Sequence, residues 1–232
     1  MEKEIKGKIV EIFHSIQGEG KYVGQRHIFV RLAGCNIGAC SYCDTDYAAQ
    51  SEMTAEEVVK NILLLRKKED IRTISVTGGE PLVQDEFLEN VLKLLSSEGV
   101  KILLETNGTM PEAFERIKTY VDIVSIDIKL PSSCSGKSYW SQHTEFLQRA
   151  SEKDLYIKVV VGKETEGKEF SRAIDCVRKI DKAIPFFIQP ESDIDGKCRI
   201  TEEKLVDLFK LANKSLLEVR VMPQIHKILN VP

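Results

Sequence analysis

The alternation of strand-like and helical segments is the feature that most limits the folds open to this chain. Segments with apolar residues at helical spacing separate short runs of aliphatic and β-branched residues, and a capping box at 54–57 and Pro111 predict two of the helix starts. Strands that alternate with helices build βαβ units and a parallel sheet. The expected strands are residues 27–32, 72–76, 100–104, 123–126, 156–161, 186–188 and 219–222.

The number of these units predicts the architecture. About six βα units are fewer than the eight of a closed TIM barrel, so we expect an α/β fold with a partial, incomplete TIM-like barrel of parallel strands. Right-handed crossovers place the carboxyl ends of the strands on one rim, where ligands bind in such folds. The chain has 232 residues without a repeat or a long linker, and we expect a single domain over residues 1–232.

Composition and charge exclude several classes of protein. Hydrophobic residues make up 42% and charged residues 30% of the chain, which is typical of a globular protein. The net charge of −3 and the scattered basic residues predict no nucleic-acid partner. No apolar run reaches the roughly 18–20 residues that span a bilayer. Because no apolar segment follows the first residues, we expect no secretory signal, no membrane partner and a cytoplasmic location.

Polar residues and glycines follow the predicted strands, as expected if a site lies on the rim. The first three strands are followed by Gly34, by a Thr-Gly-Gly-Glu segment at 77–80 and by a Glu-Thr-Asn-Gly segment at 105–108. Asp127 and Lys129 follow the fourth strand, and residues 189–190 (Gln-Pro) follow the sixth. Parallel strands would bring all of these residues to one edge.

The cysteines are distributed unevenly along the chain. Three of the six lie within nine residues, at Cys35, Cys40 and Cys43. A reducing compartment disfavours disulfides, and clustered thiols there indicate metal or redox chemistry. Isolated cysteines are usually small buried residues rather than ligands. We interpret three cysteines in that way: Cys134, Cys176 and Cys198.

The C-x4-C-x2-C spacing alone leaves two kinds of metal site open. Three thiolates from one loop can hold a [4Fe–4S] cluster and leave one iron without a protein ligand. A structural zinc site needs four nitrogen or sulfur ligands. The fourth ligand would have to come from a distant residue, with three candidates: His14, His27 and Cys134.

Two segments together resemble the radical S-adenosylmethionine (SAM) superfamily. They are residues 34–45 (Gly-Cys-Asn-Ile-Gly-Ala-Cys-Ser-Tyr-Cys-Asp-Thr) and residues 77–81 (Thr-Gly-Gly-Glu-Pro). The resemblance implies that Cys35, Cys40 and Cys43 are catalytic ligands of a [4Fe–4S] cluster whose open iron chelates SAM. It also implies that the Gly-Gly-Glu segment meets the SAM amino group. Glycines permit a close approach of the backbone, and oxygen atoms accept hydrogen bonds from an ammonium group.

The front of the chain resembles one family within that superfamily. Residues 13–20 (Phe-His-Ser-Ile-Gln-Gly-Glu-Gly), 29–31 (Phe-Val-Arg) and 43–45 (Cys-Asp-Thr) are similar to the 7-carboxy-7-deazaguanine synthase (QueE) family. Further similar segments at 105–108, 125–129, 189–190 and 221–227 extend the resemblance over essentially the whole chain. The first two cysteines are separated by four residues instead of the usual three. A loop absorbs one residue cheaply, so we expect a locally different path over residues 36–39.

The family resemblance implies a specific reaction. The enzyme would be a carbon–nitrogen lyase that converts 6-carboxy-5,6,7,8-tetrahydropterin into 7-carboxy-7-deazaguanine with release of ammonia, on the route to queuosine in tRNA and other 7-deazapurines. The implied cofactors are a [4Fe–4S] cluster, SAM and Mg²⁺, with a flavodoxin- or ferredoxin-type electron donor and a homodimeric assembly. The cofactor carries the difficult chemistry, while the protein positions the reactants and excludes water.

The resemblance also implies the residues of the site. The expected substrate contacts are Ile16, Gln17, Gly18, Glu19, Arg31, Thr77, His226 and Pro232. The expected SAM contacts are Tyr42, Cys43, Asp44, Gly78, Gly79, Glu80, Glu105, Asn107, Ser125, Asp127, Lys129 and Gln189. Thr45 is the expected Mg²⁺ ligand, because Mg²⁺ prefers oxygen ligands.

The chemistry of these side chains supports the implied roles, but other interpretations of the same residues remain open. Gln17 and Glu19 can read amide and amine groups, Arg31 can pair with a carboxylate, and the terminal carboxylate at Pro232 is expected to point into the site. The residues around Gln17 could instead form a solvated turn. Asp127 and Lys129 could be a plain salt bridge.

Two rival functions remain at this point. One is another radical SAM enzyme, such as an activase that places a radical on a partner protein. The other is a non-catalytic zinc or iron–sulfur module that docks partners. The residues at 17–20, Arg31 and Thr45 favour a small carboxylated substrate over the activase. The hypothesis of a non-catalytic metal module does not explain why Gly-Gly-Glu and Glu-Thr-Asn-Gly segments follow the strands.

Overall fold

Strands and helices alternate along the chain as the sequence predicts. The computed structural model describes residues 5–38, 40–43, 46–193 and 196–232. The strands are β1 (Gly7–Ile16), β2 (Arg26–Leu32), β3 (Ser51–Met53), β4 (Thr73–Gly78), β5 (Lys101–Thr106), β6 (Ile123–Asp127), β7 (Asp154–Val161), β8 (Phe186–Pro190) and β9 (Val219–Val221). The helices are α1 (Ala55–Glu69), α2 (Asp85–Leu95), α3 (Pro111–Ile117), α4 (Trp140–Ala150), α5 (Gly167–Ile180), α6 (Glu202–Asn213) and α7 (Ile225–Leu229).

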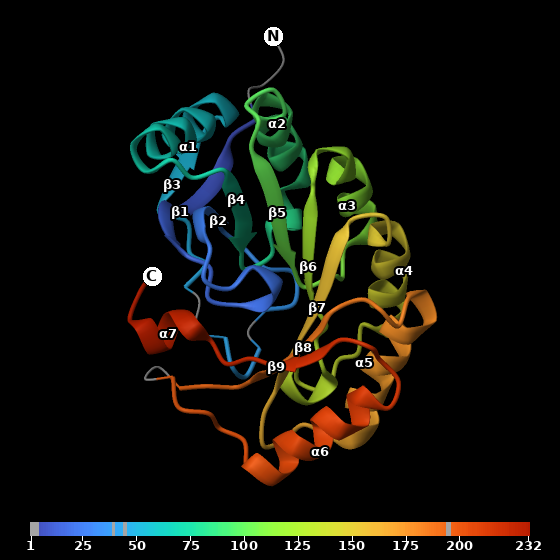
Figure 1. Ribbon diagram of the computed structural model, residues 1–232. Coiled ribbons are helices and arrows are strands. Elements are labelled where there is room, and N and C mark those ends of the chain that lie inside the picture. The colour runs from blue at the N-terminus through green and yellow to red at the C-terminus, as the bar shows by residue number, and fades with distance from the viewer. Residues whose placement is uncertain (1–4, 39, 44–45, 194–195) are drawn as a thin grey trace.

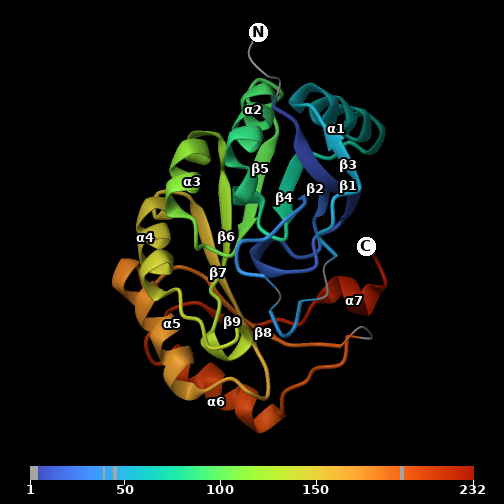
Figure 2. The same ribbon diagram turned by 180° about the vertical axis from the view of Figure 1, so that it is seen from behind.

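The strands form one mixed sheet in the order β3-β1-β2-β4-β5-β6-β7-β8-β9. β1 is antiparallel to both of its neighbours, and every other pair is parallel. Within the described part of the chain, β3 and β9 are the two edges, so the sheet stays open. Helices α1 to α6 follow one another along one face of the sheet (Figures 1 and 2). This is the partial barrel that the sequence predicts.

The alternation of side chains along the strands separates two apolar layers. The larger layer lies between the sheet and the helices and includes a stacked pair, Phe114 of α3 and Phe146 of α4, with ring centroids 4.6 Å apart. A smaller cluster fills the inside of the curved sheet and contains Leu103, Ile123, Tyr156 and Phe187. The next inward-facing residues along the same strands are polar, and they border a cavity at the carboxyl ends of the strands: Glu105, Ser125, Lys158 and Gln189.

Several elements differ from the sequence prediction. β1, β3 and α7 were not predicted, because β1 alternates only weakly and the other two are short. Helix α2 ends at Leu95, and a turn covers residues 96–99. Gly99 itself has a φ of 64°, the left-handed conformation that glycine adopts readily. The capping box at Thr54 and the helix start at Pro111 are confirmed.

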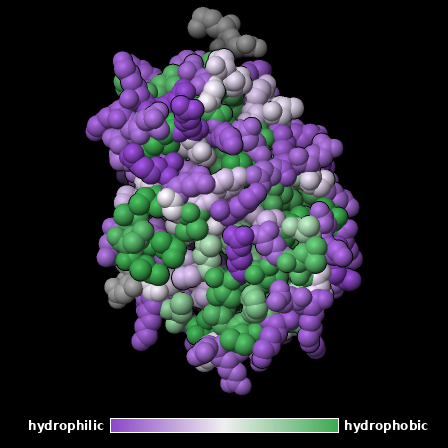
Figure 3. Space-filling model, viewed as in Figure 1, coloured by the Kyte–Doolittle hydropathy of each residue, from purple (hydrophilic) through white to green (hydrophobic). Residues whose placement is uncertain are grey.

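The segment after β9 returns to the beginning of the sheet. The Ile225 N–H donates to the carbonyl oxygen of Gly18 at 3.0 Å, and the Ser15 hydroxyl donates to the Pro232 carbonyl oxygen at 2.6 Å. α7 therefore lies beside the loop that follows β1 (Figure 1). Apolar surface gathers over α7 and β9 on the face shown in Figure 3, where Ile228 and Leu229 are exposed. Among the described helices, none combines the length and apolarity needed to cross a membrane.

The stacked pair between α3 and α4 gives a stability prediction. Phe146→Ala is expected to lower the free energy of unfolding by about 3–5 kcal/mol, because Phe146 is fully buried and the cavity left behind cannot collapse completely. Urea unfolding followed by circular dichroism measures the change. Leu64→Ala, at a residue that is 59% exposed, is the control and should change stability by less than about 0.5 kcal/mol. Equal effects of the two substitutions would contradict the packing described here.

Candidate active site

A cavity of about 640 Å³ opens at the carboxyl ends of the parallel strands. Its size is within the usual range of small-molecule and cofactor sites. Residues from both ends of the chain border it. The structure brings the following sequence-predicted residues together around it: Ile16, Gln17, Gly18, Glu19, Arg31, Cys35, Cys40, Tyr42, Cys43, Thr77, Gly78, Gly79, Glu105, Asn107, Ser125, Asp127, Lys129, Gln189, His226 and Pro232.

Three sequence-predicted residues need separate mention, because two lie outside the described residues and one is described but does not line the cavity. Asp44 and Thr45 lie outside the described residues, so the predicted SAM contact and the predicted Mg²⁺ ligand stay predictions. Glu80 is fully buried beside the cavity, and its carboxylate faces the backbone of neighbouring loops. A SAM contact of Glu80 also stays a prediction.

The cysteine loop forms one end of the cavity. Cys35, Cys40 and Cys43 all border it, although among the described residues no three His, Cys, Asp or Glu side chains converge on a common point. Cys35 and Cys40 are partly exposed and Cys43 is exposed, so the three thiols are accessible from the cavity. Three thiolates from one loop fit a [4Fe–4S] cluster that keeps one iron open to a ligand in the same cavity.

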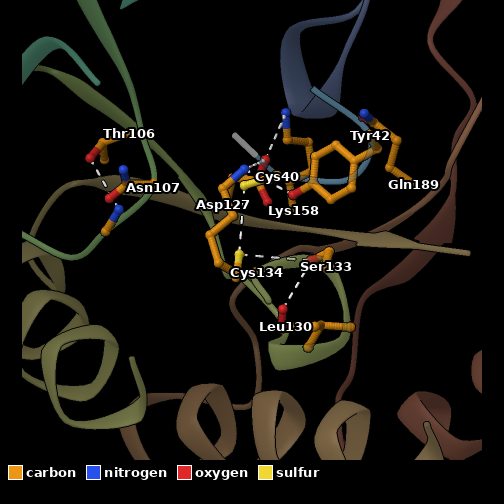
Figure 4. Close-up of polar contacts among 12 residues, drawn as sticks. Cys40, Tyr42, Thr106, Asn107, Asp127, Leu130, Ser133, Cys134, Lys158 and Gln189 are labelled. Atoms are coloured by element: carbon orange, nitrogen blue, oxygen red, sulfur yellow. Dashed lines mark hydrogen bonds and ion pairs between the residues drawn. The ribbon is translucent and has the colours of Figure 1, made fainter. Parts of the chain in front are cut away.

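A fourth cysteine lies against this loop. The Cys40 and Cys134 sulfur atoms are 3.6 Å apart and face each other (Figure 4). The Ser41 N–H donates to the Ser133 carbonyl oxygen at 3.0 Å, which joins the two loops. The burial of Cys134 is confirmed, and Cys134, one of the three candidates for a distant fourth ligand, lies against the cysteine loop. The position of Cys134 after the end of β6 is the sequence signal for this contact.

The glycines after β4 permit a close backbone approach to the start of the cysteine loop. A Cβ atom on Gly79 would lie 2.4 Å from the Gly34 carbonyl oxygen, and one on Gly78 would lie 2.2 Å from the Leu32 carbonyl oxygen. Both distances are too short for real contacts, so residues with side chains do not fit here. The Glu80 N–H donates to the Gly34 carbonyl oxygen at 2.9 Å and completes this junction.

The Glu80 carboxylate ties the end of β4 to the end of β5. It accepts hydrogen bonds from the Leu82 N–H at 3.1 Å, the Thr106 hydroxyl at 2.9 Å and the Asn107 N–H at 2.7 Å. Burial raises the pKa of Glu80 to about 7, although these hydrogen bonds and the charge of Lys129 oppose the shift. Glu80 therefore acts on the site by holding the two loops together.

The first residues of the cysteine loop are anchored to the loop after β5. The Asn107 amide donates to the Asn36 side-chain oxygen at 2.9 Å, and the Asn36 amide donates to the Thr109 hydroxyl at 2.8 Å. Asn36 is the first residue of the expanded spacing between Cys35 and Cys40. Its contacts show how the start of this longer loop is held, while Ala39 lies outside the described residues.

Lys129 connects the cysteine loop to β6. Its Nζ donates to the Asp127 carboxylate at 2.9 Å and to the Tyr42 hydroxyl at 2.9 Å. Burial alone would lower the pKa of Lys129, but the charges of Asp127 and Tyr42 outweigh burial and raise it well above its ordinary value. The salt bridge considered from sequence is present. The other Asp127 oxygen, Oδ1, is buried and has no hydrogen-bond partner within the described residues, so an acceptor is left for a ligand.

The loop after β1 also borders the cavity and is not a solvated turn. Gln17 is only 3% exposed, and its amide donates to the Glu105 carboxylate at 2.7 Å. The Glu19 carboxylate accepts hydrogen bonds from Gln224 at 2.8 Å, from Gln189 at 3.1 Å and from Lys158 at 2.5 Å. The turn interpretation is therefore wrong for Gln17.

Glu19 and Glu105 have pKa values shifted in opposite directions. Burial alone would raise the pKa of Glu19, but the charge and hydrogen bond of Lys158, a hydrogen bond from Gln224 and the charge of His226 outweigh burial and lower it to about 2. Burial and the neighbouring charge of Glu19 raise the pKa of Glu105. The loop after β1 thus places the ionised Glu19 carboxylate near Glu105 of β5, whose pKa is raised.

An aromatic and cationic wall lies at the end of β2. The Arg31 guanidinium is 5.6 Å from the Phe13 ring centroid and donates to the Glu11 carboxylate at 2.8 Å. The rings of Phe13 and Phe29 stack with centroids 5.2 Å apart, and both border the cavity. Arg31 and Thr77 are paired in register across β2 and β4. A planar ligand with an anionic group fits such a wall.

Other cavity residues were missed by sequence reasoning. Lys158 is a lone cation in an apolar strand run, and that interruption is the signal that could have indicated it. Gln224 lies within the segment 221–227 that the sequence singled out as a whole. Phe13 and Phe29 belong to the similar segments 13–20 and 29–31, but their apolar side chains gave no reason to predict a role in the site.

The cysteine loop, the glycine junction and the partial barrel together define a class of protein. Residues 30–185 match the family model of the radical SAM superfamily, and the chain is a member of that superfamily. Among solved structures, QueE from Escherichia coli resembles the chain with a TM-score of 0.64 and 20% identity, covering 94% of each chain. A structure of TYW1 with a lysine-pyruvate adduct has a TM-score of 0.61 and 14% identity, covering 82% of this chain and 74% of that one. Both likenesses confirm the fold.

Curated relatives narrow the class to one family. The 7-carboxy-7-deazaguanine synthase of Geobacter sulfurreducens is 34% identical over 95% of this chain and 96% of the relative. The 7-carboxy-7-deazaguanine synthase of Methanothermobacter thermautotrophicus is 36% identical over 98% of each chain. The chain belongs to the 7-carboxy-7-deazaguanine synthase family.

The assignment of Cys35, Cys40 and Cys43 as the cluster ligands predicts how iron binding responds to substitution. Cys35→Ala, Cys40→Ala and Cys43→Ala should each bring iron after anaerobic reconstitution close to zero, because each removes one of three protein ligands. Cys134→Ala should keep about four irons per chain, as expected for a [4Fe–4S] cluster. Iron analysis and electron paramagnetic resonance of the reduced protein measure the outcome. Loss of the cluster in Cys134→Ala would instead indicate a site with four cysteine ligands.

Proposed function

We infer that this chain is a radical SAM enzyme that converts 6-carboxy-5,6,7,8-tetrahydropterin into 7-carboxy-7-deazaguanine with release of ammonia. One observation carries the inference for a chain of this family. One cavity is bordered both by the cysteine loop and by the buried Gln17, the largely buried Glu19 and Arg31 with its aromatic wall. A cluster-bound SAM and a flat carboxylated substrate would meet there. The product would feed queuosine and other 7-deazapurine biosynthesis.

The cysteine end of the cavity would hold the cluster and SAM. When bound and reduced, the cluster supplies the electron that cleaves SAM and generates a carbon-centred radical. The chain itself offers the backbone at Gly78 and Gly79, which no side chain obstructs, and the unpartnered Asp127 oxygen as an acceptor. Lys129 and Gln189 border the same space and would orient polar groups of SAM.

The opposite end would bind the pterin. The Gln17 amide could donate and accept hydrogen bonds with the amide groups of the ring, and the ionised Glu19 would accept hydrogen bonds from its N–H groups. Arg31 would exchange its Glu11 partner for the substrate carboxylate, which it can bind through two parallel hydrogen bonds. Phe13 and Phe29 would pack against the ring and exclude water from the reacting atoms.

The remaining cofactor and partners are proposed on the family resemblance. Thr45 would contribute one oxygen ligand to a Mg²⁺ ion that orients the substrate carboxylate. A reductant is required, and we propose a flavodoxin- or ferredoxin-type protein. A homodimer is proposed as well, and the exposed apolar residues of α7 are compatible with a subunit contact (Figure 3). A cytoplasmic location remains the expectation from sequence.

Product formation tests the function directly. The anaerobically reconstituted protein, incubated with SAM, Mg²⁺, dithionite and 6-carboxy-5,6,7,8-tetrahydropterin, is expected to form 7-carboxy-7-deazaguanine, detected by mass spectrometry. Omitting SAM or using Cys35→Ala should abolish the product. Cleavage of SAM without any formation of deazaguanine would support the radical SAM activity but contradict the proposed pterin substrate. A protein that binds zinc and cleaves no SAM would reject both.

A further inference from the structure

Lys158 of β7 borders the cavity between Glu19 and Asp127. Its ammonium group hydrogen-bonds the Glu19 carboxylate at 2.5 Å and lies 3.5 Å from the Asp127 carboxylate. All three side chains are largely buried, with exposed fractions of 16% for Lys158, 18% for Glu19 and 14% for Asp127. Lys158 and Asp127 are register partners on adjacent strands, so the backbone of the sheet fixes their separation (Figure 4).

The balance of carboxyl groups and lysines around the cavity shows why Glu19 needs Lys158 as a neighbouring cation. Glu19, Glu105 and Asp127 bring three carboxyl groups into one cavity, opposite Lys129 and Lys158. The Lys129 ammonium is already bonded to Asp127 and Tyr42. Among the described lysine and arginine side chains, Lys158 is the cation that pairs with Glu19. A buried carboxylate that loses its cation becomes protonated or leaves its position.

The hydrogen bonds of Glu19 leave room for a ligand. One oxygen accepts from Gln189 and Gln224, and the other accepts from Lys158. A carboxylate has about four acceptor positions, so one remains for a further donor. Glu19 borders the cavity, where an N–H group of a small molecule would complete the set.

We propose that Lys158 is a positioning residue that holds Glu19 as an ionised hydrogen-bond acceptor for the substrate and links it to Asp127 on the SAM side. The proposal rests on the proposed function, because Glu19 is placed there as a substrate contact. Lys158 itself acts through Glu19. Neutral replacement of Lys158 should therefore weaken substrate binding and make that binding depend on pH.

The direction of the pH effect follows from the groups that face Glu19. Lys158 from β7 and His226 from α7 favour the ionised form, whereas burial and Glu105 from β5 favour the protonated form. With Lys158 present, the pKa of Glu19 is about 2, so Glu19 stays ionised throughout the working range of pH. Without Lys158, burial and Glu105 would raise the pKa of Glu19, and substrate binding would be lost as the pH falls toward the new value.

The test compares Lys158→Met and Lys158→Arg in the reconstituted holoenzyme between about pH 5.5 and 8.5. Lys158→Met is expected to raise KM for the pterin by about ten-fold or more with a smaller change in kcat, the size expected when a buried hydrogen-bonded group loses its partner. Its KM should rise further as the pH falls. Lys158→Arg should keep a flat profile. Lys163→Met, at an exposed lysine just after β7, is the matched control and should behave as wild type.

A double-mutant cycle separates this role from a general structural one. If Lys158 acts through Glu19, adding Lys158→Met to Glu19→Gln should cause less than about a two-fold further rise in KM. A rise of the same size in both backgrounds would overturn the proposal, as would an unchanged KM and pH profile in Lys158→Met. If Lys158→Met alone does not fold, the double variant should fold, because it contains no unpaired carboxylate at position 19; failure of both would also overturn the proposal.

The wild-type reaction in the same assay tests the proposed function separately. Absence of deazaguanine from wild type would reject that function and, with it, the substrate role assigned to Glu19 and Lys158. Wild-type turnover together with an unaffected Lys158→Met variant would reject only the role of Lys158. Binding of SAM alone, measured by equilibrium dialysis, should change less than binding of the pterin in Lys158→Met; an equal loss of both would contradict a role through Glu19.

Discussion

The parallel register from β2 to β9 is the constraint on which the rest of this structure depends. Because side chains alternate along each strand, a step of two residues leads from the packed interior to the cavity, as from Leu103 to Glu105 and from Tyr156 to Lys158. The apolar interior stiffens one end of the curved sheet, and polar groups from different strands therefore meet at the other end. The same alternation of side chains along the strands therefore packs the apolar interior and brings the polar groups of the site to the carboxyl ends of the strands.

The electrostatics of the cavity follow from that placement. Several carboxyl groups on neighbouring strands could not stay buried and ionised without nearby cations, because desolvation disfavours isolated buried charge. Lys129 satisfies Asp127 and Tyr42 near the cysteine loop, and Lys158 satisfies Glu19 near the loop after β1. The two lysines form a continuous polar network between the proposed SAM and substrate ends.

Sequence reasoning predicted the parts of the molecule that have local signals. β2 and the strands from β4 to β8 were clear from apolar periodicity, and most cavity residues followed from their positions at strand ends. β1 was missed because its weak alternation reflects a half-exposed antiparallel strand. The contact of Cys134 with Cys40 and the pairing of Lys158 with Glu19 join residues that are far apart in sequence. Such contacts depend on tertiary packing and leave no periodic pattern.

The central claim is that SAM and the pterin react within one cavity. In the reaction that the family resemblance implies, the adenosyl radical removes the hydrogen at C6 of the pterin ring, so transfer of deuterium tests the claim most directly. The reconstituted enzyme is given substrate deuterated at C6, and recovered SAM and 5′-deoxyadenosine are examined by mass spectrometry. The account predicts deuterium in the adenosyl carbon of these molecules while unlabelled substrate gives none. Formation of deazaguanine without any deuterium in the adenosyl group would show that the two molecules do not react at C6 in a shared cavity, and would contradict the account.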